Sequence, residues 1–309
     1  MADKNMTPEP DRETTHLSTR DYSLDESVRA WVFSDIQPVP EKTGDDSLWR
    51  IFTLSTAQLP VFMEHDVPES RLCISYPEST ISSTSIKQKI RLVLGLNVDT
   101  DPAIAAMRQD EDTRRYADRL EAIRPYQTDT VFEAIIKAII QQQISFRAAN
   151  SITKKLVLAT QDVFSWNGHS FYGFPTHESI LNLGVEGLRG IGLGPKADYV
   201  FGICNLIEDC HFSPESLRNS DYESVAAELA PIRGIGPWTI GAVAISGLGL
   251  FHTFPYSDLG IRRIVGRFLE GVHAASVEQV VEFRNRFGES GDMVLYLLMC
   301  GEVLGVLGE

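Results

Sequence analysis

The feature that most constrains the fold is a turn rich in glycine and proline between two helical segments, in the stretch Leu229–Ala244. The first segment must end near Pro231, which has no amide hydrogen to donate. A second helix is predicted to begin at Pro237, because proline suits the first helical position. Gly234 and Gly236 lie between them, and their backbone can approach another chain closely. Free amides at the start of the second helix suit a phosphate, although a plain helix–helix turn explains the pattern equally well.

Helical periodicity dominates the chain after Ser85. The clearest helix begins at Thr130, where Thr130 and Glu133 form the Thr-x-x-Glu pattern of a capping box and isoleucines recur on one face. Further helices are predicted at 151–159, 196–208, 221–230, 237–246, 258–270, 276–287 and 291–304. Between residues 22 and 76, short β-favouring runs such as Ala30–Phe33 alternate with turn residues. We therefore expect a mainly α protein with two helical lobes, a helix-hairpin-helix motif and a small N-terminal β-rich (α+β) lobe.

These patterns divide the chain into three parts. Residues 1–20 are predicted to be a flexible tail, because their polar composition cannot offset the entropy of ordering. Residues 21–105 form the N-terminal β-rich lobe, and residues 106–309 form the helical core. Within that core, the hairpin covers 221–246 and a segment with a candidate catalytic carboxylate covers 251–270.

The formal charge of −14 opposes binding to a polyanion, but the cations are unevenly distributed. Three cations and no acid lie in 145–155, and four cations with one acid lie in 231–267. A DNA-binding face requires these stretches to meet in space; otherwise they are ordinary solvated helix faces. No apolar run suits a membrane span or a signal peptide, and the four cysteines are scattered. We expect a cytoplasmic protein (nucleoid-associated, or nuclear in a eukaryote), with no membrane association and no disulfide.

Asp258 is the carboxylate that most suits catalysis. It lies 22 residues after Gly236, directly after a loop that contains Phe251, Phe254 and Tyr256, and at the predicted start of a helix. A helix start favours the anionic form of a carboxylate. An anion held beside an aromatic wall can stabilise the positive charge that develops on a sugar when its base departs. The alternative is that Asp258 is only a helix cap.

Two segments, Gly234–Thr239 and Asp258–Arg262, resemble the helix-hairpin-helix (HhH-GPD) DNA glycosylase superfamily. Within it they are most similar to the alkylpurine branch, 3-methyladenine DNA glycosylase II, whose DNA-contacting helix end also resembles Ile139–Ser145. The resemblance covers roughly residues 129–304. It implies a base-excision repair enzyme that flips a damaged base out of double-stranded DNA and hydrolyses its N-glycosidic bond.

The resemblance also implies a role for each matching residue. Asp258 is the catalytic carboxylate, and Gln143 or Ile144 fills the gap left by the flipped nucleotide. The implied DNA-binding residues are Gly234, Gly236, Gln143, Ile144, Ser145 and Arg262. The candidates for the base pocket are Trp238, Phe254 and Tyr256. The main-chain carbonyls of Ile232 and Ile235 are candidates for holding a monovalent cation.

Other chemistry is disfavoured by the residues present. Bifunctional members of the family carry a lysine in the second hairpin helix, where this chain has Trp238, which cannot form a Schiff base. Hydrolysis by water is therefore implied. The C-terminal end has only Cys300, so no iron–sulfur cluster is expected. Cys204, Cys210 and His211 lack a second pair of ligands for a metal.

Two alternatives remain open at this point. A bifunctional glycosylase/AP lyase of the 8-oxoguanine type would use another lysine, such as Lys154 or Lys196. A non-catalytic helix-hairpin-helix protein would only bind DNA. The sequence does not identify the base, since 3-methyladenine, hypoxanthine, uracil and 8-oxoguanine are all reachable on one fold. We expect a monomer.

Overall fold

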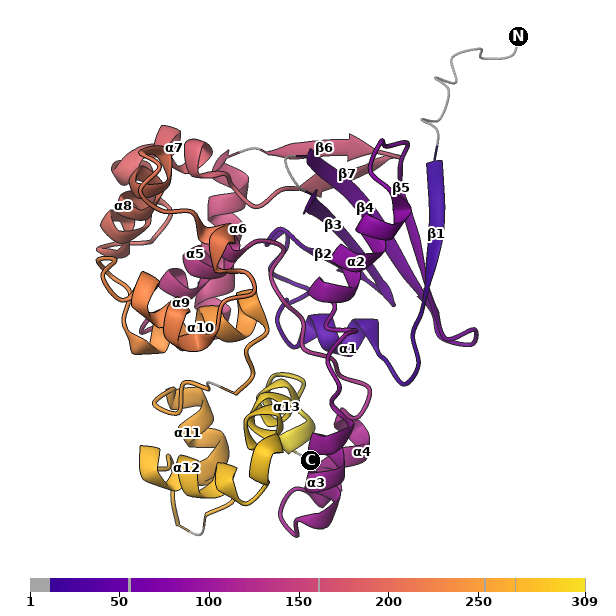
Figure 1. Cartoon of the computed structure of the whole chain (residues 1–309), viewed down its shortest axis with the longest axis vertical. Coiled ribbons are helices and arrows are strands. Elements are labelled where there is room, and N and C mark those ends of the chain that lie inside the picture. Colours follow the sequence, from indigo (N-terminus) through magenta and orange to yellow (C-terminus); the bar gives the residue numbers. More distant parts are fainter. Residues whose placement is uncertain (1–11, 55–56, 161, 253, 270, 309) are drawn as a thin grey trace.

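The computed structural model describes residues 12–54, 57–160, 162–252, 254–269 and 271–308, and it arranges them in three lobes (Figure 1). The N-terminal lobe is built on an antiparallel sheet with strand order β1-β5-β4-β3-β2. Its elements are β1 (Arg12–Ser18), α1 (Leu24–Arg29), β2 (Lys42–Gly44), β3 (Ser47–Leu54), β4 (Ala57–Asp66), β5 (Arg71–Pro77) and α2 (Ser83–Val93). Apolar side chains of the sheet and of α1 and α2 form one core. The expectation of a small N-terminal sheet beside a mainly helical body is confirmed.

Strand β1 corrects the predicted flexible tail. Residues 12–18 pair with β5, with Leu17 opposite Leu72, and Leu17 is buried. Residues 1–11 of the predicted tail lie outside the described residues. Composition missed the strand because its stability comes from backbone pairing along β5 and from alternate burial of side chains, neither of which needs many apolar residues.

The middle lobe is helical and has a core of its own. Its helices are α5 (Val131–Gln141), α6 (Phe146–Thr160), α7 (His177–Gly190), α8 (Lys196–Glu208), the 3-10 helix η1 (Pro214–Leu217), α9 (Tyr222–Leu229) and α10 (Pro237–Leu248). A hairpin of strands β6 (Val163–Trp166) and β7 (His169–Tyr172) leaves this lobe and packs on the N-terminal sheet, where Trp166 and Phe171 bury Ile51.

The helix α5 begins as predicted, but its cap differs from a capping box. The Thr130 hydroxyl accepts a hydrogen bond from the Glu133 amide at 3.0 Å. The Glu133 carboxylate instead accepts from the Asp129 amide and from Arg50 of β3, at 3.2 and 2.6 Å. Glu133 therefore links the middle lobe to the N-terminal sheet through Arg50 and does not complete a capping box with the Thr130 amide.

The third lobe is assembled from two distant parts of the chain. It contains α3 (Asp101–Gln109) and α4 (Arg114–Leu120), together with α11 (Leu259–Gly266), α12 (Val277–Asn285), η2 (Gly288–Ser290), α13 (Gly291–Val303) and η3 (Val306–Gly308). Their apolar faces share one core, which includes Met107, Leu120 and Leu298. The predicted boundary at residue 105 therefore falls inside α3. In the part of the chain described here, no helix has both the length and the apolar character needed to cross a membrane.

Candidate active site

Helices α9 and α10 are joined by a short loop that places two glycines in different surroundings. Gly234 has φ +92°, and a Cβ there would lie 2.3 Å from the Tyr199 ring of α8. Both its conformation and its packing therefore require glycine. Gly236 caps α10, and a Cβ at Gly236 would meet no atom within 4 Å. The open space at Gly236 leaves the start of α10 accessible to another molecule.

The turn between α5 and α6 lies against this loop. The Gln142 side-chain amide donates to the Gly234 carbonyl at 2.8 Å and to the Thr239 hydroxyl at 2.9 Å. On its other side, the Lys196 ammonium donates to the carbonyls of Ile140 and Gln142 at 2.7 and 2.6 Å. These bonds fix the position of the turn relative to α8 and α10. Sequence reasoning did not select Gln142, although its place next to Gln143 in a polar run was visible.

Gln143 and Ile144, predicted to fill the gap left by a flipped nucleotide, and Ser145, predicted to contact DNA, are at the exposed tip of this turn. Gln143, Ile144 and Ser145 are all exposed, and Ile144 keeps 37% of its surface open although it is apolar. Gln143 has φ +59°, a left-handed conformation that costs free energy for a residue with a side chain. An exposed apolar side chain on a strained, tightly anchored turn suits insertion into another molecule.

Asp258 connects the α9–α10 hairpin to the third lobe. One carboxylate oxygen, Oδ1, accepts from the Ile261 amide at 3.0 Å and so caps α11. The other, Oδ2, accepts from the indole N–H of Trp238, in the first turn of α10, at 2.9 Å. Asp258 is half-buried. Asp258, predicted to be catalytic, therefore contacts Trp238, predicted to line the base pocket, across the boundary between the third and middle lobes.

The two other predicted base-pocket residues lie in the third lobe. Phe254 is only 5% exposed and belongs to the core of that lobe, so the prediction that it stacks on a base needs correction. Tyr256 is half-buried, and its hydroxyl donates to Asp292 of α13 at 2.7 Å. Burial, followed by the hydrogen bond to Asp292, raises the pKa of Tyr256 to about 12. Arg284 holds the same carboxylate in an ion pair at 2.8 Å.

The remaining predicted residues have defined positions. Arg262, on α11, donates from Nε to the Ala275 carbonyl at 2.6 Å, so part of its guanidinium is used to hold the following loop. Ile232 and Ile235 lie in the loop before α10, and the Ile232 carbonyl accepts from the Ile235 amide at 3.1 Å. A monovalent cation at these carbonyls stays a prediction.

The candidate metal ligands of the middle lobe do not converge. Cys204 is wholly buried in the core, and burial raises the pKa of its thiol to about 12, whereas Cys210 is exposed. Among the residues that the structure describes, no three His, Cys, Asp or Glu side chains are grouped so that they could hold a metal ion.

Gln142, three residues before the first basic stretch (145–155), bonds to Gly234 in the second basic stretch (231–267). Arg147 forms an ion pair with Asp35 and is partly neutralised. Lys155 and Arg263 are exposed and, within the described ranges, have no ion-pair partner.

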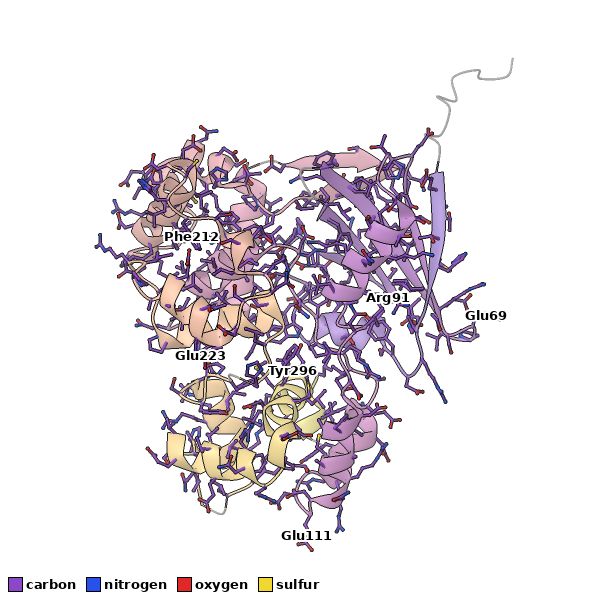
Figure 2. The ribbon with its side chains drawn as sticks, in the orientation of Figure 1. Glu69, Arg91, Glu111, Phe212, Glu223 and Tyr296 are labelled. Atoms are coloured by element: carbon purple, nitrogen blue, oxygen red, sulfur yellow. The ribbon has the colours of Figure 1, made fainter. Side chains whose placement is uncertain are left out.

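Sequence reasoning missed an aromatic cluster where the three lobes meet, around Tyr296 of α13 (Figure 2). Trp31 stacks on Tyr296 with ring centres 5.6 Å apart, and its indole N–H donates to the Tyr296 hydroxyl at 2.7 Å. Phe146 meets Trp31 edge-on, and Phe251 meets Tyr296 edge-on. Ala30–Phe33 was predicted to be β-favouring, but this run follows α1 as a turn, so its aromatic residues face the other lobes instead of a sheet.

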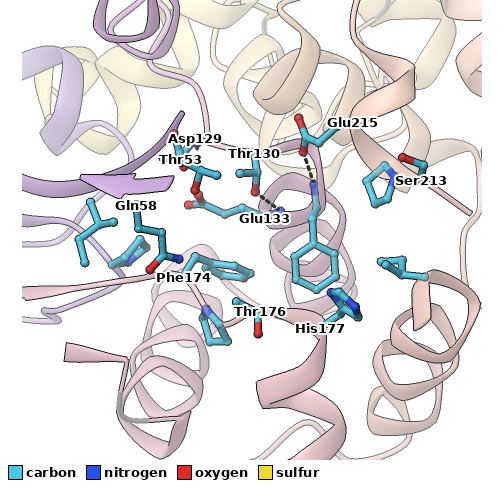
Figure 3. Close-up of a pocket in the computed structure, with 16 residues that line it drawn as sticks. Thr53, Gln58, Asp129, Thr130, Glu133, Phe174, Thr176, His177, Ser213 and Glu215 are labelled. Atoms are coloured by element: carbon cyan, nitrogen blue, oxygen red, sulfur yellow. Dashed lines mark hydrogen bonds between the residues drawn. The ribbon is translucent and has the colours of Figure 1, made fainter. Parts of the chain in front are cut away.

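A separate cavity of about 260 Å³ lies between the N-terminal sheet and the middle lobe (Figure 3). The aromatic residues Phe132 and Phe174 and the acids Glu133 and Glu215 are part of its lining. Glu215 is already engaged, because it accepts a hydrogen bond from the Val131 amide at 2.6 Å. Asp258 is not among the described residues that line this cavity, so the cavity is distinct from the carboxylate site.

Comparison with known proteins identifies the fold and the family. A solved structure of 3-methyladenine DNA-glycosylase from Archaeoglobus fulgidus superimposes with a TM-score of 0.83 and 31% identity, over 93% of this chain and 98% of that chain. Residues 136–287 match the model of the HhH-GPD superfamily base excision DNA repair proteins. The chain belongs to the HhH-GPD superfamily. The family predicted from the sequence is confirmed.

Curated relatives support the same branch of the HhH-GPD superfamily. A DNA-3-methyladenine glycosylase of Bacillus subtilis is 30% identical over 167 residues, which are 54% of this chain and 55% of the relative. DNA-3-methyladenine glycosylase 1 of Schizosaccharomyces pombe is 28% identical over 57% of this chain and 75% of its own length. The match thus spans about half the length of the Bacillus relative.

Proposed function

We propose that this protein is a monofunctional DNA glycosylase of the 3-methyladenine type, which flips a damaged base out of double-stranded DNA and hydrolyses its N-glycosidic bond. The observation that carries the proposal is the contact between Asp258 and Trp238 at 2.9 Å. It places the only carboxylate predicted to be catalytic directly beside the start of α10. The names of the relatives in Archaeoglobus, Bacillus and Schizosaccharomyces support the reaction class.

The carboxylate of Asp258 is suited to stabilising a sugar cation. Two donors, the Ile261 amide and the Trp238 indole, hold its two oxygens in place. A carboxylate has about four lone-pair sites, so two remain for the substrate or for water. Departure of the base leaves an oxocarbenium-like deoxyribose, and the fixed anion lowers the free energy of that transition state. Water then adds to the sugar carbon, and Asp258 is placed to orient it.

The α9–α10 hairpin is the proposed helix-hairpin-helix motif that binds the DNA backbone. The open amide region at Gly236, at the positive end of α10, suits a phosphate. The exposed side chains of Gln143 and Ile144 would fill the space left by the flipped nucleotide. Lys155 and Arg263 add exposed positive charge, one in each of the two basic stretches. We propose that a monomer binds the duplex.

A monovalent cation is compatible with the loop before α10. The Ile232 carbonyl uses one lone pair for the Ile235 amide, which leaves the other free, as carbonyl oxygens have two. The carbonyls of Ile232 and Ile235 would hold the ion, and its charge would strengthen phosphate binding beside Gly236.

The Asp258→Asn variant tests the proposal. It keeps the shape of the side chain but removes the anion, so we expect single-turnover release of an alkylated base to fall about 100- to 1000-fold. Binding to an abasic-site duplex should persist, because the phosphate contacts remain. Asp118→Asn makes the same chemical change on the exposed surface of α4 and should leave the rate unchanged. Base release by Asp258→Asn at the native rate would refute the assignment.

A bifunctional glycosylase/lyase is the second candidate, and one observation favours it. Burial lowers the pKa of Lys196, and its amine lies at the same turn as Gln142. A lysine nucleophile needs a free lone pair, however, and two carbonyls hold this ammonium in its charged form. Borohydride reduction with abasic DNA distinguishes the candidates, because only a lyase leaves a covalent adduct.

A further inference from the structure

A buried carboxylate of α13, Asp292, is the centre of a set of hydrogen bonds that the proposed reaction does not use. Asp292 lies in the first turn of α13 and is only 1% exposed. Its Oδ1 accepts from the Tyr256 hydroxyl at 2.7 Å. Its Oδ2 accepts from Nη2 and Nε of Arg284, on α12, at 2.8 and 3.2 Å. Both oxygens of this buried group therefore have donors.

Arg284 holds Asp292 at a point where two helices are packed closely. In addition to its ion pair, the guanidinium donates from Nη1 to the Gly288 carbonyl at 3.1 Å, in the turn between α12 and α13. Gly291 packs on the same arginine, because a Cβ there would lie 2.2 Å from the Arg284 carbonyl oxygen. A carboxylate that takes two hydrogen bonds from one guanidinium in such a place has little freedom to move.

Tyr256 connects this rigid point to the loop that carries Asp258. The Asp258 amide donates to the Pro255 carbonyl at 2.8 Å, so Tyr256 lies inside the turn that ends at the carboxylate. Among residues 255–257, all of which the structure describes, the one side-chain hydrogen bond is that of Tyr256 to Asp292. Loss of this bond would free the main chain directly before Asp258.

The hydroxyl of Tyr256 is a donor in this bond. Burial, followed by the hydrogen bond to Asp292, raises the pKa of Tyr256 to about 12, so the phenol keeps its proton at neutral pH. A phenol that donates to a carboxylate makes a charge-assisted hydrogen bond, which is stronger than a bond between two neutral groups. The turn before Asp258 is therefore anchored more firmly than a neutral pair would allow.

We propose that Asp292 is a positioning residue for the proposed base-release reaction: through Tyr256, it fixes the place of the Asp258 carboxylate. The inference rests on the proposed glycosylase function and adds a support that reaches Asp258 through the main chain, whereas Trp238 contacts the carboxylate itself. A shift of about 1 Å in a group that stabilises a transition state can lower the rate about 100-fold. A looser turn therefore slows the reaction even when the protein stays folded.

Tyr256→Phe is the main test, because it removes the hydroxyl and keeps the ring. The substrate is duplex DNA methylated with dimethyl sulfate, and release of methylpurines is followed under single-turnover conditions with saturating protein. We expect release to slow about ten-fold, while affinity for an abasic-site duplex stays within about two-fold of the wild type.

Tyr116→Phe is the matched control for the loss of a hydroxyl. Tyr116 belongs to α4 in the same lobe and is buried, and its hydroxyl makes no hydrogen bond to another residue that the structure describes. This variant should release methylpurines at the native rate. A native rate for Tyr256→Phe as well would overturn the inference.

Asp292→Asn tests whether Tyr256 acts through the carboxylate. The asparagine oxygen must face the two donors of Arg284, so its NH₂ group turns toward the phenol, which loses its charged acceptor. We expect release to slow about three-fold, and the variant that combines Tyr256→Phe with Asp292→Asn to be no slower than Tyr256→Phe alone. Additive losses, about thirty-fold in the combined variant, would show that the two residues act independently and would overturn the proposed link.

The Asp258→Asn variant separates positioning from a general loss of stability. If Tyr256 affects the rate only through Asp258, adding Tyr256→Phe to Asp258→Asn should lower the residual rate less than about two-fold. Equal slowing by Tyr256→Phe in both backgrounds would mean a structural role and would overturn the inference. Thermal melting identifies any variant that does not fold, and if Asp292→Asn is one, this comparison decides alone.

The wild type distinguishes failure of the inference from failure of the proposed function. If the wild type releases no methylpurine, the glycosylase function fails, and the inference that rests on it fails with it. If the wild type is active and Tyr256→Phe matches Tyr116→Phe, only the role of Asp292 is overturned.

Discussion

The middle lobe meets its two neighbours through interfaces of opposite character. Toward the N-terminal lobe, Arg50 of β3 bonds Glu41 and Glu133, and all three side chains are wholly buried. Toward the third lobe, Ile245 of α10 packs into the apolar core of that lobe, and the half-buried carboxylate of Asp258 accepts the indole N–H of Trp238. Charges at the first interface are neutralised by one another. At the second interface the carboxylate of Asp258 is only half-buried and has no cationic partner among the described residues, and that difference is what the proposed catalytic role requires.

The pKa of Glu41 shows how completely the first interface is paired. Burial alone raises the pKa of a carboxyl group, yet attraction to Arg50 and then to Lys137 lowers the pKa of Glu41 to about 2. The Tyr126 hydroxyl donates to the same carboxylate at 2.9 Å. A group held this firmly as an anion stabilises the fold and is unavailable for proton transfer at neutral pH.

The largest effect should come from breaking the buried network. Arg50→Met leaves Glu41 and Glu133 charged and buried, so we expect the free energy of unfolding to fall by about 3 to 5 kcal/mol. Chemical denaturation measures this value. The control, Arg71→Met, removes an exposed arginine that pairs with Asp66 on the same sheet, and it should change the unfolding free energy very little. Equal losses in both variants would contradict the contrast between buried and exposed charges.

Acid should weaken the same interface. Because the folded-state pKa of Glu41 lies below its ordinary value near 4.5, its contribution to stability is full above that value and is lost as the pH falls toward 2. We expect Glu41→Gln to be less stable than the wild type at pH 7, and its unfolding free energy to depend less steeply on pH below 5. Denaturation curves at several pH values measure both slopes, and parallel slopes would show that Glu41 does not titrate with folding.

The second interface is tested by Trp238→Phe, which keeps the ring but removes the N–H that orients Asp258. We expect base release to slow about ten-fold, the effect of one lost hydrogen bond to a charged group. Trp166→Phe is the matched control, since the described residues give its buried indole N–H no acceptor. A native rate for Trp238→Phe would mean that the Ile261 amide alone positions the carboxylate.

The smallest effect should follow from loosening the turn between α5 and α6. Gln142→Ala removes the bonds to Gly234 and Thr239, so we expect base release to fall about three-fold. Gln141→Ala, at the end of α5, is the control. If both variants slow the reaction equally, the side-chain amide of Gln142 does not fix the turn.

Local sequence signals predicted the parts of the site that depend on local structure. The glycine and proline pattern placed the start of α10 at Pro237, and the cap and spacing singled out Asp258. Phe254 was misjudged because an aromatic residue in a loop looks the same whether it faces a cleft or a core; only packing against the third lobe decides its burial.

What the sequence could not supply were contacts between distant segments. Trp31 and Tyr296 are 265 positions apart, and no periodicity connects them. The same holds for α3 and α4, whose helical pattern gives no hint that they pack with α13 rather than with the adjacent sheet. Strand β1 was missed for a related reason, since its partner β5 lies over fifty residues away along the chain.

Because the third lobe is built from two distant parts of the chain, its core can form only after the C-terminal helices have been synthesised. Helices α3 and α4 bury their apolar faces only when α13 arrives, after the whole middle lobe has been synthesised. Closing so long a loop is entropically costly and slow. The same late step brings Tyr296 to Trp31, so a nascent chain that lacks α13 exposes the apolar faces of α3 and α4 and lacks this contact. Completion of the third lobe therefore coincides with the final commitment of the chain to its native topology.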